Sequence, residues 1–123
     1  MLDITYKLKQ KIQKCDSIEE RLEVLKDKYK GETAYVTACG PSINELDDNI
    51  LKTKLKVKLV VSIKQSFDII GSELCDLHIL NTYNLKPTQY DYGDTNGTII
   101  AWGLAKSYAN EQIKKIVRQN RPF

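Results

Sequence analysis

The 123-residue sequence predicts a three-layer α/β fold, in which a short parallel sheet is preceded by an N-terminal helical hairpin. Two observations predict this class: helical periodicity in residues 1–31, and short apolar runs separated by helical segments after residue 32. The chain is long enough for one hydrophobic core. We therefore expect a helical hairpin over residues 1–31 and a single α/β domain over residues 32–123.

The composition is that of an ordinary globular protein, with 41% hydrophobic and 28% charged residues. The net charge is +3, from 19 basic and 16 acidic residues whose signs are interleaved along the chain. No basic stripe with aromatic residues set into it is visible, although such a stripe is typical of nucleic-acid binding. We expect no nucleic-acid partner.

The three cysteines, Cys15, Cys39 and Cys75, are widely spaced and odd in number. With no C-x-x-C pair and a single histidine, they do not form a zinc-binding set, so we expect reduced thiols and neither a metal nor a cofactor. No apolar run reaches the ~20 residues of a membrane span, and the N-terminus lacks the apolar core of a signal peptide. These features predict a cytoplasmic protein.

The helical hairpin is predicted from two amphipathic patterns. Residues 3–15 have apolar side chains at helical spacing, and these are Ile4, Leu8, Ile12 and Cys15. Ser17 and Glu20 form a capping box that begins a second helix, and Lys30-Gly31 ends it. The apolar stripe expected along this second helix consists of Ile18, Leu22, Leu25 and Tyr29.

Three strands and two helical connections follow. Residues 33–39 predict a buried first strand, and the unbroken apolar stretch in residues 56–63 predicts a central parallel strand. Residues 75–81 predict a third strand. A capping box of Ser42 and Glu45 predicts a short helix over residues 43–52, and residues 64–74 predict a second short helix. Strands joined by short helical crossovers are expected to pair in parallel.

The remainder of the chain has weaker patterns. Residues 82–97 predict a long loop, and long loops in compact domains are often functional. Its tyrosines, Tyr83, Tyr90 and Tyr92, either stack on a base or sugar or pack the loop onto the domain. Asp91 and Asp94 either bind a metal or a sugar hydroxyl or are solvated loop acids, the simpler interpretation. Residues 98–103 predict a fourth strand or the start of a helix, and residues 104–119 predict a helix.

The A-C-G-P-S turn after the first strand is the strongest indication of a binding site. Ligands of open parallel sheets bind beyond the carboxyl ends of the strands, where the strand order reverses. Gly40 allows a ligand close to the backbone, Pro41 stiffens the turn, and Ser42 stands where a helix is expected to begin, a position that favours an anion. Alternatively, Ser42 is only a helix cap, with Glu45 as its reciprocal partner.

Two well-known phosphate motifs are absent. The turn has one glycine, whereas a dinucleotide fingerprint needs G-x-G-x-x-G, and no G-x-x-x-x-G-K sequence is present. The glycine turn of methyltransferases is a closer alternative. That turn normally has a second glycine where this chain has Ser42, and an acidic residue within the strand.

Three motifs together resemble a Rossmann-like group: G-P-S-I after the first strand, S-I-K-Q-S after the second, and D-L-H-I-L-N in the third. The group includes bacterial sialyltransferases, with an N-G-P-S-L motif, and pterin pyrophosphokinase-like proteins. In the sialyltransferases, polar residues at the ends of these strands hold a cytidine monophosphate donor. The matching positions in this chain are Gly40, Pro41, Ser42 and Asn81, with Lys64 or Gln65 after the second strand.

The resemblance covers about residues 33–84 and includes two departures. Cys39 replaces the usual asparagine or glycine of the first motif, and Lys64 replaces an asparagine. The general-base histidine of the sialyltransferases lies well downstream of these strands, and the chain contains no such segment. The resemblance thus implies either the N-terminal portion of a longer enzyme or a reduced relative that binds without turnover.

The resemblance implies a Rossmann-like nucleotide-binding domain that is glycosyltransferase-like and takes a nucleotide sugar as its partner. Two alternatives remain: a non-catalytic binding or interaction module, and pyrophosphoryl transfer to a pterin-like substrate, which needs magnesium. His78 is the only histidine, and its position within a strand favours a structural role. Asp76 begins the same strand and is a candidate to orient it.

Overall fold

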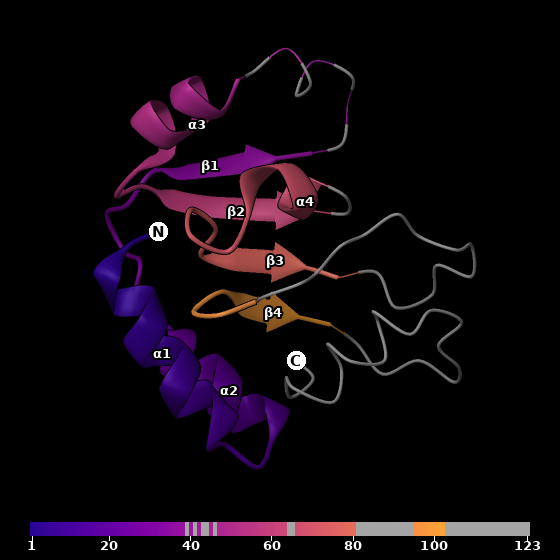
Figure 1. Ribbon diagram of the computed structural model, residues 1–123. Coiled ribbons are helices and arrows are strands. Elements are labelled where there is room, and N and C mark those ends of the chain that lie inside the picture. Colours follow the sequence, from indigo (N-terminus) through magenta and orange to yellow (C-terminus); the bar gives the residue numbers. More distant parts are fainter. Residues whose placement is uncertain are drawn as a thin grey trace, which may run out of the picture.

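The computed structural model describes residues 1–38, 40, 42, 45, 47–63, 66–80 and 95–102 (Figure 1). After the first two helices, the described strands and helices alternate as far as β3, and the next described element is another strand, β4. In chain order they are α1 (Asp3–Gln13), α2 (Ile18–Leu25), β1 (Ala34–Thr37), α3 (Asp48–Leu55), β2 (Leu59–Ile63), α4 (Ser66–Ile70), β3 (Leu77–Ile79) and β4 (Ile99–Ala101).

The described strands form one parallel sheet in the order β1-β2-β3-β4. This confirms the predicted α/β class, and residues 99–101 form a strand where a strand or a helix had been expected. In a doubly wound Rossmann order the fourth strand lies beside the first. Here β4 lies beside β3 instead, so β1 is at one edge of the described sheet.

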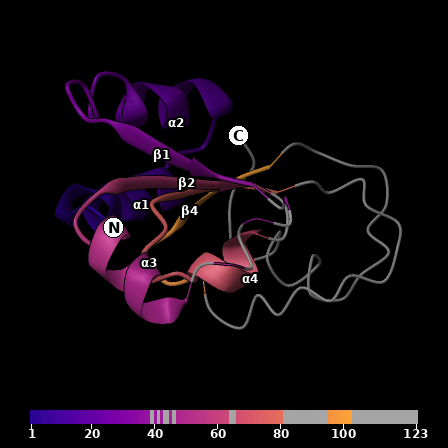
Figure 2. The same cartoon turned by 90° about the horizontal axis from the view of Figure 1, so that it is seen from above.

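The helices form a layer on each face of the sheet. Figure 2 shows α2 on one side of the sheet and α3 and α4 on the other, and α1 packs with α2 in one hydrophobic cluster. The connections β1-α3-β2 and β2-α4-β3 both advance in the same direction, so right-handed crossovers place both helices on the same face. The N-terminal helices cover the opposite face, and this arrangement gives the three layers.

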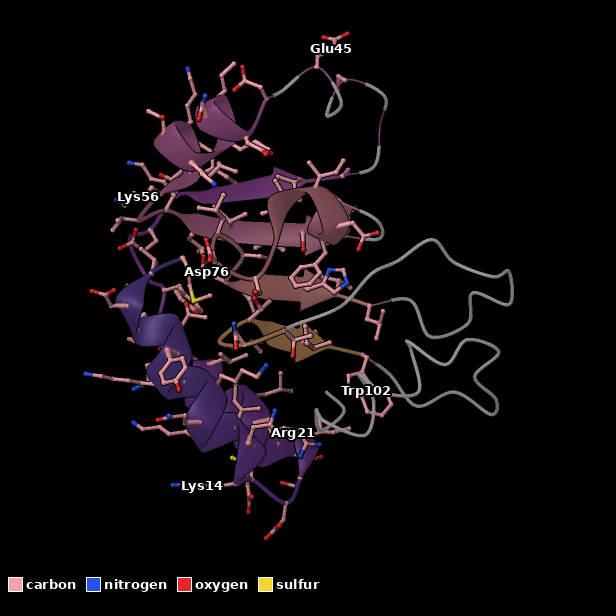
Figure 3. The ribbon with its side chains drawn as sticks, viewed as in Figure 1. Lys14, Arg21, Glu45, Lys56, Asp76 and Trp102 are labelled. Atoms are coloured by element: carbon pink, nitrogen blue, oxygen red, sulfur yellow. The ribbon has the colours of Figure 1, made fainter. Side chains whose placement is uncertain are left out.

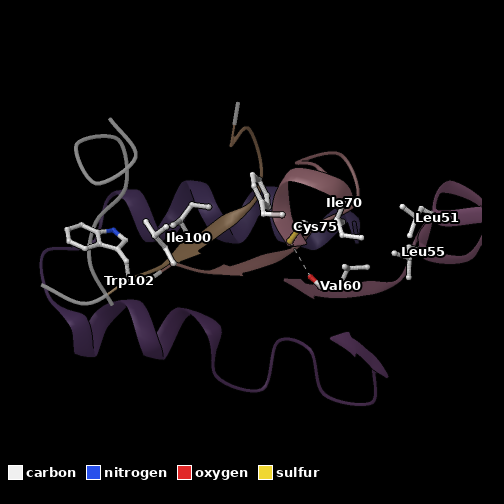
Figure 4. Packing of buried hydrophobic residues seen from close by; sticks show 9 residues of the cluster. Leu51, Leu55, Val60, Ile70, Cys75, Ile100 and Trp102 are labelled. Carbon is white, nitrogen blue, oxygen red and sulfur yellow. Dashed lines mark hydrogen bonds between the residues drawn. The ribbon is translucent and has the colours of Figure 1, made fainter. Parts of the chain in front are cut away.

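Each face of the sheet has its own hydrophobic cluster. The cluster under α3 and α4 is shown in Figure 4 and consists of Leu51, Leu55, Val60, Phe67, Ile70, Cys75, Leu80, Ile100 and Trp102. The cluster under α1 and α2 consists of Leu8, Ile12 and Ile99, with Val24, Leu25, Tyr29 and Leu77 at its margin. The first two helices therefore share a core with the sheet.

Helix α2 begins as predicted, but only part of the predicted apolar stripe packs against the core: Leu25 and Tyr29 do so. The side chain of Ser17 accepts a hydrogen bond from the N–H of Glu20 at 3.1 Å, as in a capping box. Ile18 and Leu22, expected in the apolar stripe, are 39% and 54% exposed, whereas Arg21 is buried. The helix also ends at Leu25, before the predicted stop at Lys30-Gly31.

Helix α3 begins five residues later than predicted. The sequence predicted its first turn after Ser42, but α3 spans Asp48–Leu55, and the side chain of Asp47 caps it by accepting a hydrogen bond from the N–H of Ile50 at 2.8 Å. Asp47 is as good a capping residue as Ser42, and the apolar pair Leu51 and Leu55 places the later start over the core. The prediction of a helix over residues 43–52 is wrong in its start.

Strand β1 was predicted to be buried, and this prediction is wrong. The reason is visible along one row of paired residues on the face that α1 and α2 cover. Across the register Val36–Val61–Leu77–Ile99, exposure falls from 64% at Val36 to 1% at Ile99. The N-terminal helices pack over β4, which α1 contacts directly, and leave β1 uncovered.

Several predictions concern residues outside the described part of the chain. These are most of the loop over residues 82–97, with Tyr83, Tyr90, Asp91, Tyr92 and Asp94, and the helix over residues 104–119. None of the described helices is long and apolar enough to cross a bilayer.

Candidate functional site

The predicted site lies beyond the carboxyl ends of two neighbouring parallel strands. β1 pairs in parallel with β2 over all four of its residues, and the two strands end at Thr37 and Ile63. Gly40 follows the end of β1 by three residues and is exposed. A Cβ atom built at Gly40 would meet no atom of the described residues within 4 Å. The backbone at Gly40 is thus open to a ligand.

The structure describes two of the predicted site residues. Gly40 and Ser42 are both exposed, and Ser42 has a 3-10 helical conformation. The other predicted site residues are Cys39, Pro41, Lys64, Gln65 and Asn81, which lie outside the described residues. What the structure establishes is the position of the first motif at the carboxyl edge of the sheet.

One polar side chain at this edge was not singled out from the sequence. Ser66 is completely buried, and its hydroxyl lies 2.9 Å from the carbonyl oxygen of Thr37 and 2.7 Å from that of Ile63. It also accepts a hydrogen bond from the N–H of Ile63 at 3.1 Å. Ser66 therefore fastens the ends of β1 and β2 together. Its place at the first position of a helix after a strand is the signal that could have identified it.

The dipole of α3 does not contribute to this site, although a contribution from a helix N-terminus was predicted. The sequence placed a helix N-terminus directly after Gly40, whereas α3 begins at Asp48. The carboxylate of Asp47 already occupies that N-terminus, and Asp48 adds a second negative charge in the first turn. An anion at this edge would consequently be held by the backbone around Gly40 and Ser42, without the end of α3.

The site is also more open than expected. A ligand site of an open parallel sheet is expected where the strand order reverses. Within the described sheet the order does not reverse, and β1 lies at the edge. Gly40 accordingly lies at an open corner of the sheet, where a ligand would contact fewer walls than in a crevice.

His78 is a buried residue of the sheet. It is fully buried, its Nδ1 lies 2.9 Å from the hydroxyl of Ser62, and its ring stacks on Phe67 with centroids 4.7 Å apart. Burial lowers the pKa of His78 to about 4, so the ring is neutral at pH 7. A general base must reach the proton that it removes, and this histidine is enclosed by protein atoms.

Cys75 shares the hydroxyl of Ser62 with His78. Its Sγ lies 3.1 Å from the Ser62 hydroxyl and the side chain is fully buried. Burial raises the pKa of the Cys75 thiol to about 11, so it remains protonated at neutral pH. Although Ser62, Cys75 and His78 are in contact, they lie within the core and do not form a nucleophilic site.

Asp76 was expected to orient His78. It lies instead at the amino ends of the strands, away from the candidate site at their carboxyl ends (Figure 3), and its carboxylate binds other groups. One carboxylate oxygen, Oδ1, accepts hydrogen bonds from the N–H of Leu2 at 2.8 Å and from the hydroxyl of Thr5. The other oxygen, Oδ2, accepts one from the N–H of Val60 at 2.8 Å. The carboxylate therefore joins the start of α1 to the start of β2, and its role is structural.

No group of three or more His, Cys, Asp or Glu side chains suited to a metal ion occurs among the residues that the structure describes. Comparison with protein families, with curated proteins and with solved structures finds no match to this chain.

Proposed function

We propose that this chain is a glycosyltransferase-like, Rossmann-like domain that binds a nucleotide sugar, with the donor phosphate at Gly40 and Ser42. One observation carries the proposal: β1 and β2 are parallel neighbours, and an exposed glycine with open space around it stands directly beyond the end of β1. Open parallel sheets bind ligands at this edge. Support for the sugar-nucleotide class comes from the sequence motifs at Gly40–Ser42, Lys64–Gln65 and Asn81.

Backbone N–H groups are the proposed phosphate ligands. At Gly40 no side chain covers the chain, so an anion can approach the N–H groups of the turn to hydrogen-bond distance. Ser66 holds the ends of β1 and β2 together beneath this turn. A fixed platform favours binding, because less conformational entropy is lost when the ligand arrives.

The described residues support binding more strongly than catalysis. His78 and Cys75 are buried, and Asp76 lies at the opposite edge of the sheet. None of these three side chains can therefore act as an acid or base at Gly40. A non-catalytic binding domain is thus the second candidate, and pyrophosphoryl transfer to a pterin-like alcohol would use the same anion site together with magnesium.

Thermal unfolding of the chain with added ligand tests the proposal. Cytidine and uridine monophosphates, inorganic phosphate and a pterin are compared, each with and without magnesium. A ligand that binds only the folded state, at ten times its dissociation constant, raises the melting temperature of a chain of this size by about 5 °C. A nucleotide-selective rise supports the proposal, and no rise at millimolar nucleotide contradicts it. A magnesium-dependent rise with the pterin alone favours pyrophosphoryl transfer.

A graded pair of variants localises the binding. Gly40→Leu fills the open space that the ligand would occupy, whereas Gly40→Ala alters the backbone in the same way but fills much less of that space. The proposal predicts that Gly40→Leu abolishes the nucleotide-dependent rise and that Gly40→Ala reduces it. Ser42→Ala should weaken binding with little loss of stability, because Ser42 does not cap α3. Equal nucleotide binding by wild type and Gly40→Leu would exclude this location.

A further inference from the structure

The outer edge of β1 has the features of an interface. Tyr35 is 42% exposed and Val36, on the opposite face of the strand, is 64% exposed. No described strand pairs with this edge, because β1 pairs only with β2. Between β1 and α3 lies a groove of about 240 Å³, and its lining residues are Tyr35, Val36, Thr37, Ile50, Leu51, Lys54 and Leu55.

This edge lacks most of the features that protect natural edge strands. Exposed edges are commonly blunted by charged residues, proline or a bulge, and residues 34–37 contain no charge and no proline. Parallel strands are also normally covered on both faces. The outer N–H and C=O groups of β1, which no described strand pairs with, and its exposed side chains together form a surface suited to one more strand.

We propose that a second copy of this chain occupies the edge, with the two β1 strands antiparallel about a two-fold axis perpendicular to the sheet. Such an interface is isologous, because the same surface serves both subunits. The axis must pass beside a residue that pairs with its own copy. Tyr35 and Val36 are the central residues of β1, so whichever of them lies at the axis, an exposed apolar side chain meets its equivalent.

The charges of α3 favour a second copy over an unrelated strand. Figure 1 shows α3 beside β1, at the free edge of the sheet. Asp47, Ile50 and Lys54 are spaced by three and four residues, so they share one face of α3, and Ile50 and Lys54 line the groove. The two-fold axis makes the two α3 helices antiparallel. Asp47 then faces Lys54 of the partner subunit, and Ile50 faces its own equivalent.

Sedimentation or light scattering of the whole chain, from micromolar to near-millimolar concentration, tests this dimer. The wild type should dimerise, and Val36→Lys should be monomeric, because each edge then carries a charge where an apolar pair would be buried. Val36 is largely exposed, so the variant should keep the wild-type circular dichroism spectrum and melting temperature of the monomer. Leu22→Lys is the matched control: it replaces another exposed apolar side chain, on α2 and 54% exposed, and it should dimerise as the wild type does.

A second variant tests the role of charge. Lys54→Glu places like charges on both sides of the axis and should weaken dimerisation about tenfold, whereas Lys14→Glu on α1 should leave it unchanged. A wild-type chain that is monomeric throughout the concentration range would overturn the proposal. So would a dimer that persists undiminished in both Val36→Lys and Lys54→Glu.

Discussion

The carboxylate of Asp76 accepts a hydrogen bond from the backbone N–H of Val60 at 2.8 Å, and the backbone N–H of Asp76 donates to the carbonyl of Val60 at 2.9 Å. Val60 is in β2, and Asp76 directly precedes β3, so this double contact extends the pairing of the two strands at their amino ends. Through its other oxygen the same carboxylate holds Leu2 and Thr5. One buried side chain thereby joins three elements.

Asp76→Asn should therefore destabilise the fold strongly. The amide has nearly the same shape, but its NH₂ group must face a donor, either the N–H of Val60 or the donors Leu2 and Thr5. Leaving a buried donor unsatisfied, and losing charge-assisted bonds, costs about 2–4 kcal/mol. Urea unfolding measures this loss. Asp3→Asn, at an exposed position in the first turn of α1, is the control and should change the free energy of unfolding by less than about 0.5 kcal/mol.

The role of Asp76 shows where prediction from the sequence ends. The order of the elements could be predicted because apolar periodicity and capping residues are local: residues 3–15, 56–63 and 75–81 all contain the helix or strand expected of them. The partners of Asp76 are 16 to 74 residues away. No local pattern specifies which distant backbone groups a carboxylate will meet.

Strand order is a second property that the local pattern does not contain. An apolar parallel strand has the same sequence pattern whether it is central or at an edge of the sheet. For this reason β1 was predicted to be buried. Its exposure follows from β4 lying beside β3. The same uncertainty affected the candidate site, since a reversal of strand order next to β1 was assumed, and Gly40 lies instead at an open corner.

His78 should make the stability of the protein depend on pH below neutrality. Burial lowers its pKa from 6.5 to about 4, so the unfolded chain takes up a proton at a higher pH than the folded chain does. The contribution of His78 to stability is therefore complete above pH 6.5 and decreases as the pH falls toward 4, by at most about 3 kcal/mol. Urea unfolding at a series of pH values measures this dependence.

His78→Gln is the matched variant for that measurement. Glutamine does not titrate and can still form a hydrogen bond with Ser62. The variant should be less stable than the wild type at pH 7, but its free energy of unfolding should fall less steeply between pH 6.5 and 4. Parallel pH profiles for the two proteins would show that His78 is not the group responsible.

Cys75 and Cys15 should differ in their reaction with a thiol reagent. Cys75 is fully buried and its pKa is raised to about 11, whereas Cys15 is partly exposed at the end of α1. Because the thiolate is the reactive form, native protein should be modified at Cys15 and protected at Cys75. Mass spectrometry after timed alkylation locates the label. Protection of Cys75 should disappear in urea, and modification of both cysteines at equal rates in native protein would contradict the prediction.

Arg21 is a buried residue whose replacement should not lower the free energy of unfolding, in contrast to the replacement of Asp76. Its side chain is 3% exposed and occupies the face of α2 that continues through Val24 and Leu25 into the core cluster. Its Nη1 donates to the carbonyl of Cys15 at 3.3 Å, while Nε has no hydrogen-bond partner within the described structure. A buried cation with an unsatisfied donor is costly, and an apolar side chain of similar length removes that cost.

Arg21→Met should accordingly leave the free energy of unfolding unchanged or raise it by about 1 kcal/mol. Arg21→Lys, which keeps the charge, should give no such gain, and a loss of more than about 2 kcal/mol in Arg21→Met would show that the guanidinium stabilises the fold.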